Sequence, residues 1–437
     1  MHPKFQKSVN MVKKLWKSII DLIKGGILYI LTGSVLANAI TMISSVVIAR
    51  LIDKAEYAAL AYADNFYGYI TLASGLGLST AMLKFAAVSD SPKERSKYFN
   101  YSFVCGGTFN LSLSLFLCVI VTYIQLPFEN AKKYIYLLCL YPVLQNILNT
   151  ISSYLRSSLR NKEYAVVGII QSVVVCILSI LCVIVVGAAG IISARYTGIL
   201  IALILGIVLI LKKEKLYYRE HLNHSEKKHV LATGISLMFA NLFSGMMPIN
   251  ESFLINNIIQ DEIITANFKV AGLVPSQIYL ITSALAVYFF PVVSKLTRVQ
   301  DIKKTFYKAG IINLGIVLIC TLVGLIITPV LIRLLYGPKY EDAIPISYML
   351  WGIRGMNAGV RMLPMNLLPA LGKVRFNAAL AMISTLVQFG LDYILIFLYG
   401  IDGIIYGSTI VYLVSGIAYW LYFIHVCKNW EGNDTIL

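Results

Sequence analysis

Residues 343–371 have the sequence AIPISYMLWGIRGMNAGVRMLPMNLLPAL, which is apolar and long enough to cross a bilayer, yet carries Arg354 and Arg361. Seven residues of a regular α-helix turn through about 700°, so the two side chains should lie within roughly 20° of one face. An arginine at membrane depth costs at least ~2.5–3.5 kcal/mol and normally faces a protein interior or a water-filled cavity. We therefore expect two cations on the wall of a cavity that takes an anionic group.

The composition of the whole chain is that of a polytopic membrane protein. Of the 437 residues, 58% are hydrophobic and only 13% are charged, whereas a soluble protein would be about one quarter charged. The formal net charge of +16 does not indicate a nucleic-acid partner, because the basic residues recur in short clusters between apolar runs. The bilayer is the expected partner of this surface.

Twelve apolar segments can each form a membrane-spanning helix, which is the structure that satisfies backbone hydrogen bonds in lipid. They lie at residues 25–49, 60–86, 99–124, 134–155, 163–186, 190–211, 230–257, 263–294, 309–332, 343–369, 376–399 and 403–427. Lys and Arg concentrate in alternate connecting segments, which predicts a multi-pass protein with both termini in the cytoplasm.

The longest polar interruption divides six predicted spans from six others. It is KKEKLYYREHLNHSEKKH, which we predict to be a cytoplasmic linker. The predicted organisation is an interfacial basic amphipathic helix at 1–24, an N-terminal lobe at 25–211, the linker at 212–229, a C-terminal lobe at 230–427 and a cytoplasmic tail at 428–437.

The two halves also resemble one another in sequence. LRNKEYAVVGIIQ at 159–171 parallels LGKVRFNAALAMI at 371–383, and GAAGII at 187–192 parallels GIDGII at 400–405. Each half has an even number of spans, so the repeat predicts pseudo-twofold symmetry about the membrane normal, with a substrate path at the seam.

Four stretches resemble the polysaccharide-flippase branch of the multidrug/oligosaccharidyl-lipid/polysaccharide (MOP) exporter superfamily. They are ARLIDKAEYAALAYADNF (49–66), YFFPVVSKL (288–296), LLYGPKYEDAIP (334–345) and LLPALGKVRFNAAL (367–380). The resemblance implies an all-α fold of two six-helix lobes arranged as a V, as in the related MATE transporters.

The resemblance also implies a function. Similar proteins move undecaprenyl-diphosphate-linked oligosaccharides, such as O-antigen or capsule repeat units, to the outer leaflet of the bacterial cytoplasmic (inner) membrane. We therefore expect a flippase that works by alternating access through an Arg- and Lys-lined cavity, with glycan polymerase or assembly proteins as further partners. A cation-coupled multidrug antiporter of the same superfamily is the alternative, although its cavity should be acidic.

Eight polar or ionisable residues of the predicted spans are candidates for this work. The predicted substrate-binding residues are Arg354, Arg361, Lys269, Asn38, Asp64 and Asn65, and the predicted H⁺- or Na⁺-coupling residues are Glu251 and Asp392. Other interpretations stay open at this point. The two arginines could form structural ion pairs with Glu251 or Asp392, Lys269 could neutralise Glu251, and the amides could join helices.

The sequence contains no motif of an enzyme or of a cofactor site. A Walker-type loop, GxSxG and HExxH are absent, and the connecting segments are too short for a glycosyltransferase domain. The linker histidines His221, His224 and His229 fit a solvated loop better than a metal site. We predict a transporter without a cofactor or a bound metal.

Overall fold

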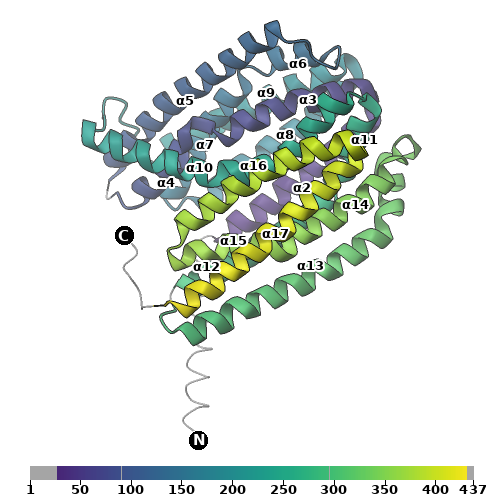
Figure 1. Cartoon of the computed structure of the whole chain (residues 1–437). Helices are drawn as coiled ribbons and strands as arrows, with labels where there is room; N and C mark the ends of the chain where they lie inside the picture. The colour runs from purple at the N-terminus through teal and green to yellow at the C-terminus, as the bar shows by residue number, and fades with distance from the viewer. Residues whose placement is uncertain (1–26, 90, 295, 431–437) are drawn as a thin grey trace, which may run out of the picture. The chain divides into compact units, whose positions relative to one another are not determined.

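The computed structural model describes residues 27–89, 91–294 and 296–430, and their regular structure is helical throughout (Figure 1). The predicted amphipathic helix at 1–24 and most of the tail at 428–437 lie outside these residues. The chain forms two compact units. Unit 1 comprises residues up to Ile48, Ala73–Tyr123 and Tyr136–Met238, and unit 2 comprises Ala49–Leu72, Ile124–Ile135 and the residues from Phe239 onward. The division into lobes at 212–229 stays a prediction.

Unit 1 is built around α7. Its elements are α2 (Ile27–Leu51) up to Ile48, η1 (Ser74–Gly77), α4 (Leu78–Ala87), α5 (Pro92–Tyr123), α7 (Tyr141–Ser157), α8 (Asn161–Val186), α9 (Ala188–Lys213) and the first part of α10 (His224–Leu254). Ile151, Tyr154 and Leu155 of α7 are fully buried in a core that also includes residues of α4, α5, α8 and α9.

Unit 2 contains the remaining helices. They are α3 (Lys54–Leu72), most of α6 (Ala131–Leu137), the end of α10, η2 (Ile255–Ile259), α11 (Glu262–Leu273), η3 (Pro275–Gln277), α12 (Ile278–Ser294), α13 (Val299–Tyr336), η4 (Pro338–Tyr340), α14 (Ala343–Met356), η5 (Asn357–Met362), α15 (Leu363–Leu367), η6 (Leu368–Leu371), α16 (Val374–Tyr399) and α17 (Ile401–Lys428). An aromatic core joins α13 to α17, where the Phe306 and Phe423 rings stack 3.8 Å apart.

The helices confirm a multi-pass membrane protein. Among the described residues, nine helices are long and apolar enough to cross a membrane, or eleven if each of two bent pairs is one span. These eleven match all the predicted spans except 343–369, which the structure divides into α14, η5, α15 and η6.

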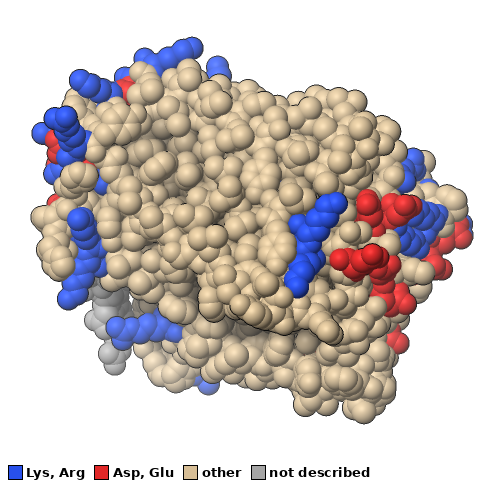
Figure 2. Space-filling model, turned by 90° about the horizontal axis from the view of Figure 1, so that it is seen from above, with Lys and Arg blue, Asp and Glu red and all other residues tan. Residues whose placement is uncertain are grey.

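The surface agrees with this conclusion. On α13, Ile311, Ile319 and Ile326 are 72%, 63% and 77% exposed, as expected for side chains that face lipid. On the face seen in Figure 2, most of the surface is uncharged.

The backbone supports the internal repeat that the sequence predicts. Gly187 joins α8 to α9 with φ 63° and ψ −144°, and Gly400 joins α16 to α17 with φ 61° and ψ −137°. The turns that precede the two hairpins are also similar, because each contains a residue with positive φ, Leu159 at 57° and Gly372 at 75°, one position apart in the sequence alignment. A conformation that favours glycine therefore recurs in both turns, and Leu159 adopts it although it is not a glycine.

A break in unit 1 is stabilised by one buried asparagine. Gly75 and Leu76 have φ of 56° and 53°, which interrupts the helical path between α3 and α4. The Gly75 amide donates to Asn110 Oδ1 (2.7 Å), while Asn110 Nδ2 donates to the Pro142 carbonyl (2.9 Å) and to Ser74 Oγ (3.0 Å). Only glycine fits at position 75, since a Cβ there would lie 2.1 Å from Asn146 Oδ1.

A second break, in unit 2, is stabilised in the same way. Residues 357–362 form a π-turn, which releases backbone carbonyls from the regular helical pattern. Asn313 of α13 is fully buried, and its Nδ2 donates to the carbonyls of Ala358 (2.8 Å) and Gly359 (3.2 Å). Thr282 of α12 holds Asn313 in place by donating to its Oδ1 (2.9 Å). The Asn313 side chain thus supplies hydrogen-bond donors to these carbonyls, which lipid cannot do.

We expect Asn313→Ala to lower the thermal stability of the purified protein. The change leaves two buried carbonyls without this donor, which should cost about 1–3 kcal/mol. Thermal unfolding in detergent measures the effect, with Gln125→Ala at an exposed position outside the helices as the control. Identical melting of Asn313→Ala and the wild type would contradict this role of the side chain.

Candidate functional site

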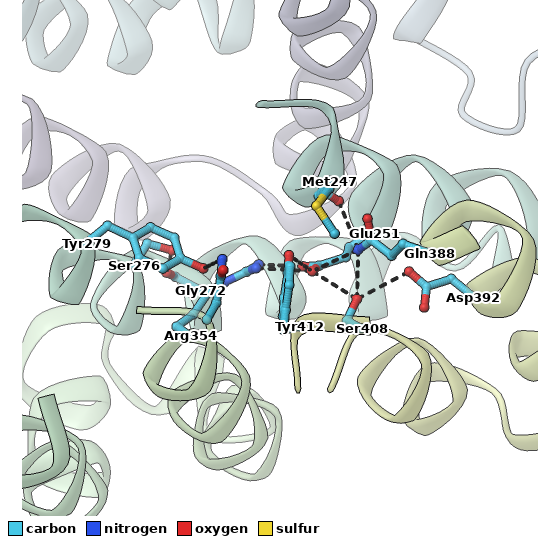
Figure 3. A network of polar contacts seen from close by, with 11 residues as sticks. Met247, Glu251, Gly272, Ser276, Tyr279, Arg354, Gln388, Asp392, Ser408 and Tyr412 are labelled. Atoms are coloured by element: carbon cyan, nitrogen blue, oxygen red, sulfur yellow. Dashed lines mark hydrogen bonds and ion pairs between the residues drawn. The ribbon is translucent and has the colours of Figure 1, made fainter. Parts of the chain in front are cut away.

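Arg354 and Glu251 form a buried ion pair in unit 2 (Figure 3). Arg354 Nη1 and Nη2 donate to Glu251 Oε1 and Oε2 at 3.1 and 2.5 Å, a bidentate arrangement of two planar groups. The two residues come from α14 and α10 and are 4% and 0% exposed. Of the interpretations that the sequence left open, the structure selects the ion pair for Arg354.

Three further donors converge on Glu251. Tyr412 Oη donates to its Oε1 (3.0 Å), Ser408 Oγ lies 3.1 Å from the same atom, and Gln388 Nε2 lies 3.4 Å away. Tyr412 and Ser408 are on α17 and Gln388 is on α16. The carboxylate of Glu251 is therefore held by side chains of three other helices, α14, α16 and α17.

Ser408 links Glu251 to Asp392. Its Oγ lies 3.1 Å from Glu251 Oε1 and 3.2 Å from Asp392 Oδ2, while Gln388 Nε2 donates to it (2.8 Å). A hydroxyl has one proton, so it can donate to only one of the two carboxylates at a time. Asp392 is 0% exposed, and no described basic side chain lies within ion-pair distance of it. The two predicted coupling residues thus lie in one network, as Figure 3 shows.

Arg361 has a different environment from Arg354. Its Nη1 donates to Asn357 Oδ1 (3.3 Å), and its guanidinium carbon lies 5.7 Å from the centre of the Tyr412 ring. The side chain is 2% exposed, and its Nε and Nη2 have no hydrogen-bond partner among the described residues. Arg361 is therefore a buried cation that still has N–H groups available to donate hydrogen bonds.

The π-turn explains why the two arginines differ. A common face requires a regular α-helix from residue 354 to residue 361, and η5 interrupts that helix at 357–362. The expected stack of two cations on one wall is therefore replaced by one ion-paired arginine and one arginine beside an aromatic ring.

Lys269 pairs with Asp64 and not with Glu251, which was one of the interpretations that the sequence left open. Lys269 Nζ lies 3.1 Å from Asp64 Oδ2 and 5.1 Å from the centre of the Tyr57 ring. Both charged side chains are about a quarter exposed, at 28% and 27%. Asn65 is next to Asp64 on α3, and its Nδ2 is buried without a hydrogen-bond partner in the part of the chain described.

These two ion pairs reduce the positive charge that we expected at membrane depth. The sequence alone suggested a surplus of positive charge at membrane depth, but Arg354 and Lys269 each have an acidic partner. In this structure neither of them presents free positive charge on a cavity wall. A substrate role for either residue stays a prediction, and it requires the pair to open.

Asn38 lies in a different environment, a polar cavity of about 490 Å³ within unit 1. The wall combines hydroxyl and amide groups from four helices. Its polar side chains are Ser34, Asn38, Ser79, Thr80, Gln145, Asn149, Ser152, Ser153, Arg156, Tyr164 and Gln171. No Asp or Glu occurs among the described lining residues. Arg156 is its single cation and lies over the Tyr164 ring, 5.5 Å from the centre.

The sequence prediction included Asn38 but missed the rest of this cavity. Gln145, Asn149, Ser152 and Arg156 recur at helical spacing on α7, and all four line the cavity. Polar side chains that recur at that spacing in a membrane span predict one wet face. This periodicity in YPVLQNILNTISSYLRS is the signal that could have found them.

Comparison with known protein families finds one that the chain matches. The profile of a family described as polysaccharide biosynthesis protein matches residues 47–345, more than half of the chain. The chain belongs to this family. No curated protein matches it.

Solved structures of MATE transporters share the fold of this polysaccharide biosynthesis family member. An inward-facing multidrug resistance MATE transporter of the MOP superfamily has a TM-score of 0.70 at 16% identity, covering 90% of this chain and 96% of its own. A Vibrio cholerae MATE transporter has a TM-score of 0.63 at 15% identity, with 94% and 97% covered. The predicted MOP fold is confirmed. At this identity the likeness concerns the fold alone.

We expect Arg354→Gln to destabilise the protein more than the double change Arg354→Gln with Glu251→Gln. Removal of one partner leaves an uncompensated buried charge, which should cost about 3–5 kcal/mol, whereas the double variant leaves none. Thermal unfolding of the purified variants measures both, and Arg375→Gln, at an exposed position, is the control. A double variant no more stable than Arg354→Gln would show that the charge pair is not what stabilises this site.

Proposed function

We propose that this chain is a transporter that moves an anionic lipid-linked oligosaccharide from the cytoplasmic to the outer leaflet of a bacterial cytoplasmic membrane. The observation that carries the proposal is the polar cavity of unit 1, lined by amides, hydroxyls and one arginine. Membership of the polysaccharide biosynthesis family and the MOP fold agree with it.

The chemistry of the cavity suits a carbohydrate. Sugar hydroxyls both donate and accept hydrogen bonds, and so do the side chains of Asn, Gln, Ser and Thr. The cavity volume of about 490 Å³ falls within the ~300–1,000 Å³ of small-molecule sites. Tyr164 adds an aromatic face on which a sugar ring can pack.

Two arginines suit the phosphate groups of such a substrate. Arg156 lines the carbohydrate cavity, and a guanidinium can form bidentate bonds to phosphate oxygens. Arg361 has donors without partners, which fits a group that binds phosphate in a conformation that opens unit 2. The resemblance to polysaccharide flippases implies undecaprenyl diphosphate as the lipid carrier, with transport by alternating access and glycan-assembly proteins as partners.

A cation-coupled multidrug antiporter is the second candidate, because the solved structures that share this fold include multidrug transporters. A cationic drug requires acidic groups in the cavity that receives it. The carbohydrate cavity has no carboxylate among its described lining residues, and Glu251 is buried against Arg354. The geometry therefore favours the lipid-linked oligosaccharide.

We expect Arg156→Gln to slow transbilayer movement of a defined lipid-linked oligosaccharide at least about tenfold, and Asn149→Ala to slow it about two- to tenfold. Loss of one hydrogen bond to a charged group costs roughly 1.5–3 kcal/mol, and loss of one between neutral groups costs about 0.5–1.5 kcal/mol. Protein reconstituted in proteoliposomes gives the rate, and Asn130→Ala, which lies outside the cavity, is the control. Wild-type rates for both variants, or efflux of cationic drugs without oligosaccharide movement, would contradict the proposal.

We further propose that Glu251 and Asp392 form the coupling site and that it takes a proton. The Ser408 hydroxyl can donate its one proton to only one of the two carboxylates at a time. A proton on the other carboxylate would let that group donate to Ser408 Oγ, so that both contacts become hydrogen bonds. Glu251 is paired with Arg354, whereas Asp392 has no ion-pair partner among the described residues, so Asp392 is the carboxylate that we expect to take the proton.

We expect Asp392→Asn to make oligosaccharide movement insensitive to an imposed pH gradient, because the amide cannot exchange a proton. The same proteoliposomes, with and without a gradient, give the measurement. Asp301→Asn, at an exposed position of α13, should retain the response of the wild type. A full gradient response in Asp392→Asn would exclude this residue as the coupling group.

A further inference from the structure

A second cavity of about 570 Å³ lies in unit 1, apart from the residues of the proposed carbohydrate cavity. It is bounded by α5, α7, α9 and the linker that follows α9. Its lining residues are Lys97, Phe99, Asn100, Tyr101, Phe103, Val104, Cys105, Ile151, Ile207, Leu216, Tyr218, His221, Leu222 and Lys227. Most of this wall is apolar. The polysaccharide transport proposed above does not use it.

The linker is fixed against α5, so the cavity is a built feature. Asn100 Nδ2 lies within hydrogen-bond distance of the carbonyls of Tyr217 (2.9 Å), Tyr218 (3.3 Å) and Glu220 (2.9 Å). The Tyr217 amide donates to Ser96 Oγ (3.2 Å). Leu216 and Leu222 on either side of this segment are buried, at 6% and 4% exposed.

The positive charge at the cavity is not balanced by acidic lining residues. Lys97 and Lys227 line it together with His221, and none of its described lining residues is Asp or Glu. The nearby carboxylates are engaged elsewhere. Glu214 pairs with Arg95 (3.3 Å) and Glu220 with Lys93 (3.0 Å), while Glu226 caps α10 by accepting from the Asn223 amide (2.7 Å).

The apolar part of the cavity opens toward the lipid-facing surface of the helices. Phe103 and Val104 of α5 are 39% and 60% exposed, and Ile207 of α9 is 36% exposed. Because α5 and α9 are both long enough to span the membrane, these side chains meet acyl chains. The ligand must therefore combine an apolar chain with an anionic head.

We propose that this cavity binds an anionic glycerophospholipid, with an acyl chain against Phe103 and Val104 and the phosphate between Lys97 and Lys227. The basic-residue distribution predicts that the linker is cytoplasmic, so the lipid comes from the inner leaflet, where anionic headgroups attract basic segments. The site holds a lipid of the bilayer and is separate from the transported substrate.

Native mass spectrometry of the full-length protein in detergent tests the proposal, with phosphatidylglycerol and phosphatidylcholine as the two probes. Wild-type protein should bind phosphatidylglycerol more tightly. The variant Lys97→Gln with Lys227→Gln should weaken that binding at least about tenfold, since each cation near an anionic lipid contributes roughly 1 kcal/mol. Binding of phosphatidylcholine should not change.

The matched control is Lys162→Gln with Lys212→Gln. It removes the same charge from the same predicted side of the membrane, at two exposed lysines that line neither cavity, and should bind phosphatidylglycerol as the wild type does. Val104→Trp, which obstructs the apolar part, should lower occupancy without a change of charge. Equal affinity of wild type for the two lipids would overturn the proposal, as would undiminished phosphatidylglycerol binding in Lys97→Gln with Lys227→Gln.

Discussion

A backbone amide or carbonyl in the interior of a bilayer has no water to bond, so each departure from a regular helix must be satisfied by the protein itself. Two such departures shape this molecule. In unit 1 the chain leaves helical geometry at Gly75 and Leu76, and in unit 2 the helix widens into a π-turn at 357–362. A buried asparagine meets each one, Asn110 from α5 and Asn313 from α13. The breaks exist because other helices carry amides at the right depth.

The π-turn also determines the polar chemistry of unit 2. It separates Arg354 from Arg361 in environment although they are seven residues apart in sequence. Arg354 is enclosed by Glu251 and its donors, whereas Arg361 lies by Tyr412 with part of its guanidinium unbonded. Arg354 therefore belongs to a charge network, whereas Arg361 has N–H groups without hydrogen-bond partners among the described residues.

The fold follows from the sequence more readily than the site does. Apolar runs and the repeated LRNKEYAVVGIIQ and LGKVRFNAALAMI segments predicted membrane helices in related halves, because burial in lipid depends on composition and the turns recur in both copies. The partner of Arg354 could not be predicted. The sequence offered Glu251 and Asp392 as partners, and the choice between them depends on tertiary packing that a linear pattern does not contain. The π-turn was missed because nothing in NAGVRM distinguishes it from an α-helical turn.

More of the polar cavity of unit 1 could have been predicted from the sequence. Intramembrane charges are few and draw attention, whereas uncharged amides and hydroxyls are common in membrane helices as contacts between helices. On α7 the helical recurrence of Gln145, Asn149 and Ser152 distinguishes a wet face from such contacts. Asn38 alone, without that recurrence, gave only one residue of the wall.

The buried charges of unit 2 have an electrical consequence. Arg354 balances Glu251, and Lys269 balances Asp64. Moving one elementary charge through a membrane potential changes the free energy by about 2.3 kcal/mol per 100 mV, but a balanced pair that moves together gains almost nothing from the field. The voltage dependence of a transport cycle built on this unit would then come from Arg361 and Asp392, which have no ion-pair partner among the described residues, or from the cargo.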